Sequence, residues 1–279
     1  ARSERMQERP NVYKDIIGDH TADVIPFEVS TIYFNGIRYS PRPPIQSYAA
    51  YNRYLDSLGY AKYMSASAPD FVLFSSASID GRCAWTDEAR VKLALLDRYR
   101  LARMVDGQVV LEKRTAPRGM IKVREEVQEA RMNEDIPVKK GEGIEFTQFY
   151  VQYNLKGTLR SLFYHSPPIN IRFTLENGET RTYKAVKPIL ADGIILNKFI
   201  DDADDFRLLF LSDGRMNADV RSVRIEIGNH GGFRPEIKMV NSWFVLPEKD
   251  TRERMADSVK MTEILNGRVT APVVVMRKE

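Results

Sequence analysis

Carboxylate, guanidinium, amide and aromatic side chains gather in three short segments of this sequence. Glu28 follows the apolar run "ADVIPF", Asp80 and Arg82 lie in "SIDGR" behind "PDFVLFSS", and the third segment is "PRPPIQSYAAY". This mixture of side chains suits hydrogen bonding to, and stacking on, a sugar or a polar head group. The candidate ligand-binding residues are Glu28, Arg42, Gln46, Tyr48, Tyr51, Asp80 and Arg82.

The three segments can meet if they follow strands of one open α/β sheet. In such a sheet the ligand crevice lies outside the carboxyl ends of the strands, so we expect the segments to converge on one edge. A structural alternative stays open: Arg82 pairs with Glu28 or Asp87 only to fix its loop, while the tyrosines fill the core. Ion pairs also gather at sheet ends for purely structural reasons.

An enzymatic alternative uses the same segments. Glu28 and Asp80 would act as acid and base on a sugar or an ester, and Arg82 would orient the substrate in a deep pocket. Nearby arginines lower the pKa of a carboxylic acid, which does not favour a general acid here. The sequence has no G-x-S-x-G, P-loop, G-x-G-x-x-G or H-E-x-x-H motif. We therefore predict no catalytic residue and no cofactor.

Metal ligands are also poorly represented. His20, His165 and His230 lie far apart, and Cys83 is the only cysteine, which excludes a cysteine cluster and an intramolecular disulfide. The acidic run at residues 201–205 could offer carboxylates to Ca²⁺, but it lacks the glycine of a calcium loop. A solvated acidic loop is the better interpretation, so no metal site is predicted, and calcium binding there stays open.

Composition indicates a folded chain without a strong electrostatic preference. Of the 279 residues, 43% are hydrophobic and 29% are charged, which excludes wholesale disorder and suits two domains. Lys and Arg number 42 against 38 Asp and Glu, and this excess of four is spread along the chain. Because nucleic-acid binding usually needs a basic face, no nucleic-acid partner is predicted.

The first part of the chain, from about residue 12 to 114, alternates short apolar runs with segments of helical periodicity. "ADVIPF" and "PDFVLFSS" are typical of buried strands, and "YRLARMVDGQVVLEKR" of two strands around an Asp-Gly turn. The pattern predicts an α/β domain over residues 1–114 with an open, mainly parallel, Rossmann-like sheet.

Three helices are expected within this domain. "EVSTIYFNG" predicts a helix that stops at Gly36, and "TDEARVKLALLDRY" one that is capped at Thr86 or Asp87. A third helix would begin at the cap residue Ser47 and stop at Gly59. Its aromatic and aliphatic stripe would consist of Tyr48, Tyr51, Leu55 and Leu58.

Beyond residue 114 the pattern changes. Residues 115–142 are charged and predict a connector or an edge strand. Residues 143–247 alternate with a period of two, and "FRLLFLS" is among their expected strands, so they predict an antiparallel β-sandwich domain. Residues 248–279 predict a short helix that stops at Asn266-Gly267, followed by the apolar strand "VTAPVVVM", both docking on the body.

Two features bear on location. No apolar run approaches the length of a membrane-spanning helix, and "ARSERMQERP" lacks a signal-peptide core. The chain starts with Ala1 rather than methionine. We therefore expect an excised part of a longer protein whose membrane segment lies upstream.

The stretches "ADVIPFEVSTIYFNGIRYSPRPPIQSYAAYNRYLDSL", "APDFVLFSSASIDGR" and "DEARVKLALLDRY" carry a family resemblance. They resemble the extracytoplasmic C-terminal portion of large uncharacterised bacterial polytopic membrane proteins, whose membrane part is similar to lipid-linked-sugar glycosyltransferases. The resemblance covers residues 20–114 well and extends weakly across the expected sandwich. It implies a soluble accessory region on the periplasmic side of the cytoplasmic membrane, partnered by the membrane-spanning region of the same polypeptide and by glycan or lipid-linked sugar. In glycosyltransferases of this general design the catalytic carboxylates lie in membrane-proximal loops, which this chain lacks.

The sequence thus leads to two functional hypotheses. The favoured one is a noncatalytic extracytoplasmic accessory or binding module that recognises glycan or polar head groups. The alternative is the sugar- or ester-acting enzyme with its carboxylate and arginine site at the carboxyl edge of the sheet.

Overall fold

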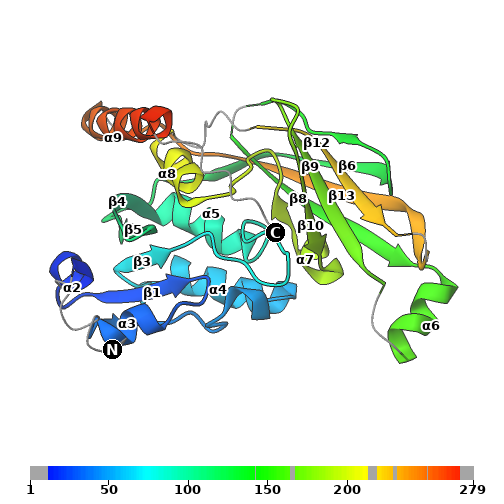
Figure 1. Cartoon of the computed structure of the whole chain (residues 1–279), viewed down its shortest axis with the longest axis horizontal. Helices are drawn as coiled ribbons and strands as arrows, with labels where there is room; N and C mark the ends of the chain where they lie inside the picture. The colour runs from blue at the N-terminus through cyan, green and yellow to red at the C-terminus, as the bar shows by residue number, and fades with distance from the viewer. Residues whose placement is uncertain are drawn as a thin grey trace.

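The chain folds into a mixed α/β structure whose described residues form three β-sheets (Figure 1). The computed structural model describes residues 12–141, 143–163, 167–212, 219–228, 231–249 and 251–270. One sheet is mixed and has five strands, and two sheets are antiparallel with four strands each. Among the described helices none is long and apolar enough to cross a membrane.

The five-stranded sheet has the strand order β2-β1-β3-β5-β4. β1 is parallel to β2 and β3, whereas β5 is antiparallel to β3 and β4, so the sheet is mixed where the sequence predicts a mainly parallel one. The antiparallel pairs arise because the Asp106-Gly107 turn, with both residues at positive φ, closes β4 and β5 into a hairpin. The elements of this part are α2 (Val12–Ile17), β1 (Thr21–Ile25), α3 (Ser30–Phe34), β2 (Arg38–Tyr39), α4 (Arg53–Met64), β3 (Phe71–Phe74), α5 (Ala89–Arg98), β4 (Tyr99–Val105) and β5 (Gln108–Lys113).

Helix α4 begins later than the sequence predicts. Ser47 opens only a short 3₁₀ turn over Ser47–Ala49, and α4 starts at Arg53. The cap is Asn52, whose side chain accepts a hydrogen bond of 3.0 Å from the backbone N–H of Leu55. Tyr48 and Tyr51 therefore precede the helix and do not belong to its face.

Helix α4 also runs past its predicted stop at Gly59 and ends at Met64. Gly59 is buried against α5, where an added Cβ would lie 3.0 Å from Cγ2 of Val91. This glycine is explained by close helix packing, so it does not terminate the helix.

The two antiparallel sheets have the strand orders β10-β9-β12-β7 and β11-β8-β13-β6. β6, within the segment predicted as a connector or an edge strand, lies at the edge of its sheet. Both sheets contribute to one hydrophobic cluster, for example Phe149 of β8 and Phe173 of β9. Their strands are β6 (Ile121–Arg131), β7 (Ile136–Pro137), β8 (Ile144–Tyr153), β9 (Ile169–Leu175), β10 (Thr180–Ala185), β11 (Ile194–Ile195), β12 (Val220–Ile227) and β13 (Phe233–Val245), and the helices nearby in sequence are α6 (Leu155–Phe163) and α7 (Lys187–Asp192).

The expected strand "FRLLFLS" is instead part of helix α8 (Ala203–Leu211). Its buried residues Phe206, Leu209 and Phe210 recur at i, i+3 and i+4, the spacing of a helix face. Short apolar runs fit either a buried strand or a buried helix, and here the helical spacing is the correct one.

The C-terminal helix α9 (Thr251–Thr270) continues through Asn266-Gly267, where the sequence predicts a stop. α9 packs against α8, and Lys260 Nζ donates to the carbonyl of Leu101 in β4 at 3.1 Å. The predicted strand "VTAPVVVM" starts within this helix, and residues 271–279 lie outside the described residues.

The mixed sheet and the antiparallel sheets share a hydrophobic core. Phe74 at the end of β3 stacks on Phe206 of α8 with ring centroids 3.6 Å apart. Trp85 Nε1 donates to the carbonyl of Lys198 at 2.9 Å, and both Ile144 and Phe146 of β8 belong to the same cluster. The helices α5 and α8 thus connect the two parts (Figure 1).

Candidate functional site

Two of the three segments predicted to converge are joined beneath the surface by Arg42. Its side chain is fully buried and forms a bidentate pair with Glu88, with Nε 2.9 Å from Oε1 and Nη2 2.9 Å from Oε2. Nη1 lies 3.3 Å from Oδ2 of Asp23 in β1. A planar guanidinium suits such a buried pair because it binds two carboxylates with fixed geometry.

Arg42 also donates to backbone and hydroxyl oxygens of two segments. Nη1 donates to the carbonyl of Val24 at 2.7 Å, and Nη2 donates to the carbonyl of Pro26 at 3.2 Å and to Ser47 Oγ at 2.9 Å. The Ser47 N–H in turn donates to the carbonyl of Pro26 at 2.9 Å. Arg42 therefore ties the end of β1 to the 3₁₀ turn, and its donors are occupied within the protein.

Burial dominates the electrostatics of this cluster. It raises the pKa of Asp23, while Arg42 and the 2.8 Å hydrogen bond from the Tyr63 hydroxyl act in the opposite direction. Burial also raises the pKa of Tyr63 well above its usual value, with the charge of Asp23 adding to the effect. We call this buried, hydrogen-bonded group of Arg42, Asp23 and Glu88 the Arg42 anchor.

Arg82 fixes the "SIDGR" loop from one side. It forms an ion pair with Asp87, and its Nη1 donates to the carbonyl of Tyr48 at 3.3 Å. The backbone of this loop joins β10, because the Lys184 N–H donates to the carbonyl of Gly81 at 2.9 Å. The Arg82–Asp87 pair is one of the structural arrangements that the sequence left open.

The other predicted side chains lie on the surface around this anchor. Glu28, Gln46 and Asp80 are exposed, and the Tyr51 side chain is 51% exposed. Tyr48 is partly exposed, and its ring packs edge-to-face on that of Phe27 at 5.8 Å. We call Phe27, Glu28, Gln46, Tyr48, Tyr51 and Asp80 the loop platform.

Not every member of the loop platform touches another. Arg42 joins the segments of Pro26 and Ser47, and Arg82 joins its own loop to Tyr48, so the three segments are neighbours. Within the described residues no hydrogen bond connects the Tyr51 or Asp80 side chain to the rest of the platform. The Glu28 and Asp80 carboxylates are on the surface and not in the deep pocket that the enzymatic alternative requires.

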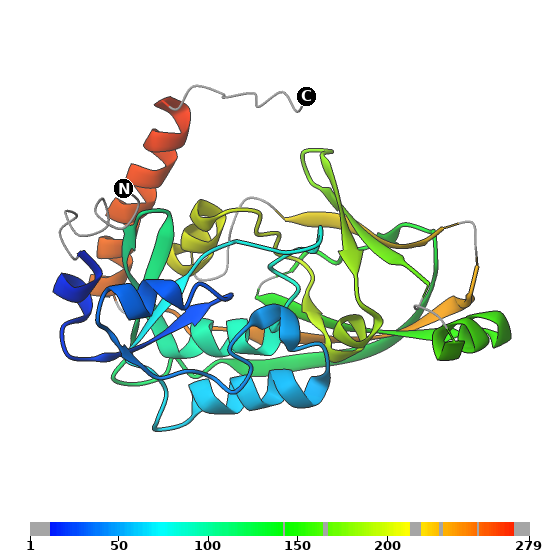
Figure 2. The same ribbon diagram turned by 60° about the horizontal axis from the view of Figure 1, so that its bottom comes forward.

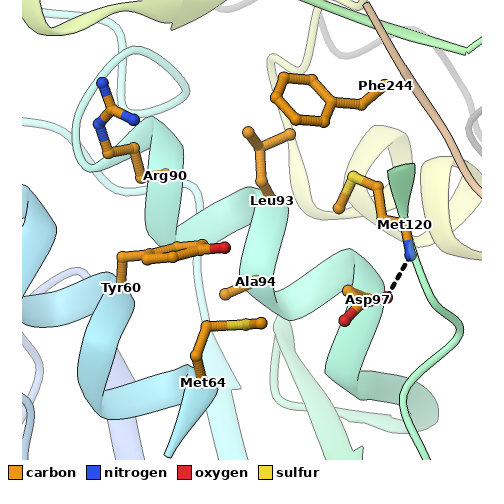
Figure 3. A pocket seen from close by; sticks show the side chains of 8 residues that line it. All are labelled: Tyr60, Met64, Arg90, Leu93, Ala94, Asp97, Met120 and Phe244. Carbon is orange, nitrogen blue, oxygen red and sulfur yellow. Dashed lines mark hydrogen bonds between the residues drawn. The ribbon is translucent and has the colours of Figure 1, made fainter. Parts of the chain in front are cut away.

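A separate pocket, which the sequence did not reveal, lies between α4, α5 and the end of β13 (Figure 3). Its volume is about 170 Å³. Tyr60 and Met64 of α4 line one side, and Met120 and Phe244 lie across from them. The α5 residues that complete the lining are Arg90, Leu93, Ala94 and Asp97.

The charged side chains that line this pocket, Asp97 and Arg90, form hydrogen bonds and an ion pair with neighbouring segments. Asp97 Oδ1 accepts hydrogen bonds of 2.8 Å from the backbone N–H groups of both Gly119 and Met120, and Figure 3 shows the bond from Met120. Arg90 pairs with Asp192 at 3.3 Å and donates to its carbonyl at 3.1 Å. The remaining lining is largely apolar, and a cavity of this size accommodates a small apolar group, not a sugar ring with its hydroxyls.

Glu145 and Asp56 are buried carboxylates outside the loop platform whose pKa is raised to about 7. Glu145 of β8 is 1% exposed, and burial raises its pKa to about 7. Its Oε1 accepts from Thr147 Oγ1 at 3.4 Å, while Oε2 has no hydrogen-bond partner among the described residues. Burial, followed by the charges of Asp192 and Glu88, likewise raises the pKa of Asp56 to about 7. Both carboxyl groups are buried, so their ionisation affects the free energy of unfolding and they do not reach a ligand at the surface.

The acidic run at residues 201–205 is explained by the start of helix α8. Asp202 Oδ1 accepts from the Asp205 N–H at 2.8 Å, and Asp205 Oδ2 accepts from the Asp201 N–H at 3.0 Å. Asp202 is therefore the N-cap of α8 and satisfies a backbone donor that a helix leaves unpaired, while the Asp205 carboxylate accepts from the residue before the cap. The carboxylates thus cap a helix where the sequence predicts a solvated loop before a strand.

The remaining candidate metal ligands are scattered. His20 Nδ1 lies 3.7 Å from Oδ2 of Asp70, whereas His165 and His230 lie outside the described residues. Cys83 is buried, and burial raises its pKa to about 12. Within the described part of the chain, no group of three or more His, Cys, Asp or Glu side chains could hold a metal ion.

No family model matches the chain, and no curated protein matches it. Among solved structures, AlgX from Pseudomonas aeruginosa is similar over 82% of this chain and 50% of that chain, with 10% sequence identity and a TM-score of 0.29. The chain therefore spans about half the length of this structural neighbour.

Proposed function

We propose that this chain is a noncatalytic extracytoplasmic module that binds glycan or polar head groups for an upstream membrane-spanning region of the same polypeptide. The observation that carries the proposal is the Arg42 anchor, which fixes neighbouring loops from below while polar and aromatic side chains face outward. The resemblance of residues 20–114 to extracytoplasmic portions of membrane proteins supports the location and the partner.

Rigid loops support binding because little conformational entropy is lost when a ligand is held. Phe27 and Tyr48 are fixed against each other, and the exposed Tyr51 adds an aromatic face on which a sugar ring can stack. The exposed oxygens and amide of Glu28, Gln46 and Asp80 can exchange hydrogen bonds with sugar hydroxyls. Together these groups offer both stacking and polar contacts.

Binding has more support than catalysis at this site. Arg82 is engaged with Asp87 and with the Tyr48 carbonyl, so it is not available to orient a substrate as the enzymatic alternative requires. Glu28 and Asp80 lie in contact with water, where a general acid or base lacks the enclosed surroundings that tune it.

We further infer that the two antiparallel sheets form a β-sandwich and that the mixed sheet is a Rossmann-like open sheet. The shared cluster containing Phe149 and Phe173 supports the sandwich, since facing sheets bury their inner side chains against each other. The parallel β2-β1-β3 order, with helices between the strands, supports the second inference.

Ligand binding is tested by titrating the chain with monosaccharides, nucleotide sugars and polyprenyl-phosphate head groups while following its thermal unfolding. At a concentration of 100 times its Kd, a ligand is expected to add about 2.7 kcal/mol to the free energy of unfolding. Tyr51→Ala and Gln46→Ala are expected to weaken binding roughly tenfold or more, because each removes a direct contact.

Tyr33→Ala is the matched control, because Tyr33 is 79% exposed on α3 and outside the loop platform. Its affinity for the same compound should equal that of the parent chain. The proposal is wrong if no compound of the panel raises the unfolding temperature, or if the compound that does so binds the Tyr51→Ala and Gln46→Ala variants as tightly as the parent.

A further inference from the structure

Helix α6 carries an apolar stripe that faces solvent. In Figures 1 and 2 this helix lies at the end of the antiparallel sheets that is farthest from the mixed sheet. Its sequence LKGTLRSLF places large apolar side chains at i, i+4, i+7 and i+8, on one face. The stripe consists of Leu155, Leu159, Leu162 and Phe163, which are 79%, 50%, 71% and 76% exposed.

The opposite face of α6 is packed against the body. Gly157, the buried residue of this helix, lies nearly opposite Leu155 because two residues advance about 200° around an α-helix. An added Cβ on Gly157 would overlap the carbonyl oxygen of Gly232. The glycine therefore allows close contact on one side, which leaves the apolar stripe pointing outward.

Asn154 fixes the beginning of α6. Its Oδ1 accepts from the Gly157 N–H at 2.9 Å, and its Nδ2 donates to the carbonyl of Phe233 at 3.1 Å. Its backbone N–H donates to the carbonyl of Gly232 at 3.1 Å. These contacts tie the helix to the start of β13, so the outward direction of the stripe is built into the fold.

The two charged residues of α6 are both positive. Lys156 and Arg160 border the apolar stripe on one flank, and the nine residues of α6 include no Asp or Glu. Lys187 lies 4.2 Å from the ring centroid of Tyr153, the last residue of β8 before α6. Apolar residues bordered by cations are the pattern of a helix that lies in the interface of an anionic membrane.

We propose that α6 inserts its apolar stripe into the interfacial region of an anionic lipid bilayer. The positive flank complements anionic head groups, and insertion of four side chains suits shallow membrane binding. A stable protein interface usually buries about 800 Å² per partner, which a stripe on a nine-residue helix does not supply by itself. This inference goes beyond the proposed ligand binding and does not depend on it.

The test is flotation of the chain with phosphatidylcholine vesicles that contain or lack phosphatidylglycerol. The chain is expected to float with the anionic vesicles and to dissociate as salt is raised. The double variant Leu159→Ser, Phe163→Ser should weaken this binding roughly tenfold or more, and Lys156→Ala with Arg160→Ala should weaken it on anionic vesicles. A Phe163→Trp chain should show a blue shift of its emission when it binds.

Val127→Ser is the matched control, since Val127 is 62% exposed on β6 and lies outside α6. Tyr51→Ala should also leave vesicle binding unchanged, which separates this proposal from ligand binding at the loop platform. Absence of binding to anionic vesicles overturns the proposal, as does binding that the α6 variants leave unchanged. A dimer in sedimentation that dissociates in the Leu159→Ser, Phe163→Ser chain would also overturn it and identify the stripe as a protein interface.

Discussion

Replacing Arg42 by methionine is expected to lower the free energy of unfolding by about 3–5 kcal/mol, because it leaves Asp23 and Glu88 buried without their cation. Methionine keeps much of the apolar volume of the arginine side chain. The loss of stability therefore reflects the buried, unpaired carboxylates more than a cavity. Urea unfolding near neutral pH checks this value. Burial raises the pKa of Asp23, and below that pKa the loss should shrink, since a protonated carboxyl costs less to bury.

Two further variants make this result specific. Arg42→Lys should recover only part of the stability, because an ammonium cannot form the bidentate pair with Glu88 together with the other contacts of the guanidinium. Arg100→Met removes the exposed pair with Glu112 and should cost less than about 1 kcal/mol. A loss in Arg42→Met as small as that in Arg100→Met would show that the anchor does not hold the loops.

Replacing Glu145 by glutamine is expected to stabilise the chain by about 3 kcal/mol above pH 7. The folded state holds the proton of Glu145 up to a pKa of about 7, whereas the unfolded state releases it near the ordinary glutamate value of 4.5. Between these two values the folded state binds more protons, so the free energy of unfolding falls as pH rises and stays low above the folded pKa. Glutamine is neutral at every pH in this range, so the Glu145→Gln chain lacks this pH-dependent loss of stability.

The measurement is the free energy of unfolding of both chains from pH 4 to pH 9. The Glu145→Gln chain should lose less stability across this range, although a residual slope is expected because the pKa of Asp56 is also raised to about 7. Glu236→Gln, at an exposed position of β13, is the control and should follow the parent. Parallel curves for the parent and Glu145→Gln would contradict the burial of an ionisable carboxyl at this position.

Strands with one buried face could be predicted from the sequence because alternation is a direct consequence of strand geometry. β9 shows it clearly, as buried and partly exposed residues alternate along all seven positions. The apolar run of α8 predicts a strand from sequence because such a short run does not by itself distinguish a strand from a helix. The spacing of Phe206, Leu209 and Phe210 was the available signal.

The start of α4 depended on a contact that local sequence does not contain. Ser47 and Asn52 are both good capping residues, but the Ser47 hydroxyl accepts from Arg42 and donates to the Pro26 carbonyl at 3.2 Å. It is therefore committed to the anchor, and Asn52 caps the helix. The anchor itself joins Arg42 to Glu88, which is 46 residues away in the sequence.

Convergence of the loop segments could be expected from the topology of an open sheet, and an Arg82–Asp87 pair from their proximity in the sequence. The central position of Arg42 and the pocket beside Tyr60 could not be expected, because both depend on how distant elements pack. Met120 and Phe244, for example, reach that pocket from segments that the sequence gives no reason to bring together.

The stacking of Phe74 on Phe206 has a consequence for how the molecule unfolds. β3 and α8 share this buried contact, and Trp85 donates a hydrogen bond to the carbonyl of Lys198. Neither the mixed sheet nor the antiparallel part can therefore unfold without exposing aromatic surface of the other. The two parts are therefore thermodynamically coupled and should melt in one cooperative transition. A ligand held at the loops would consequently protect α8 and the distant helix α9 against local opening as well.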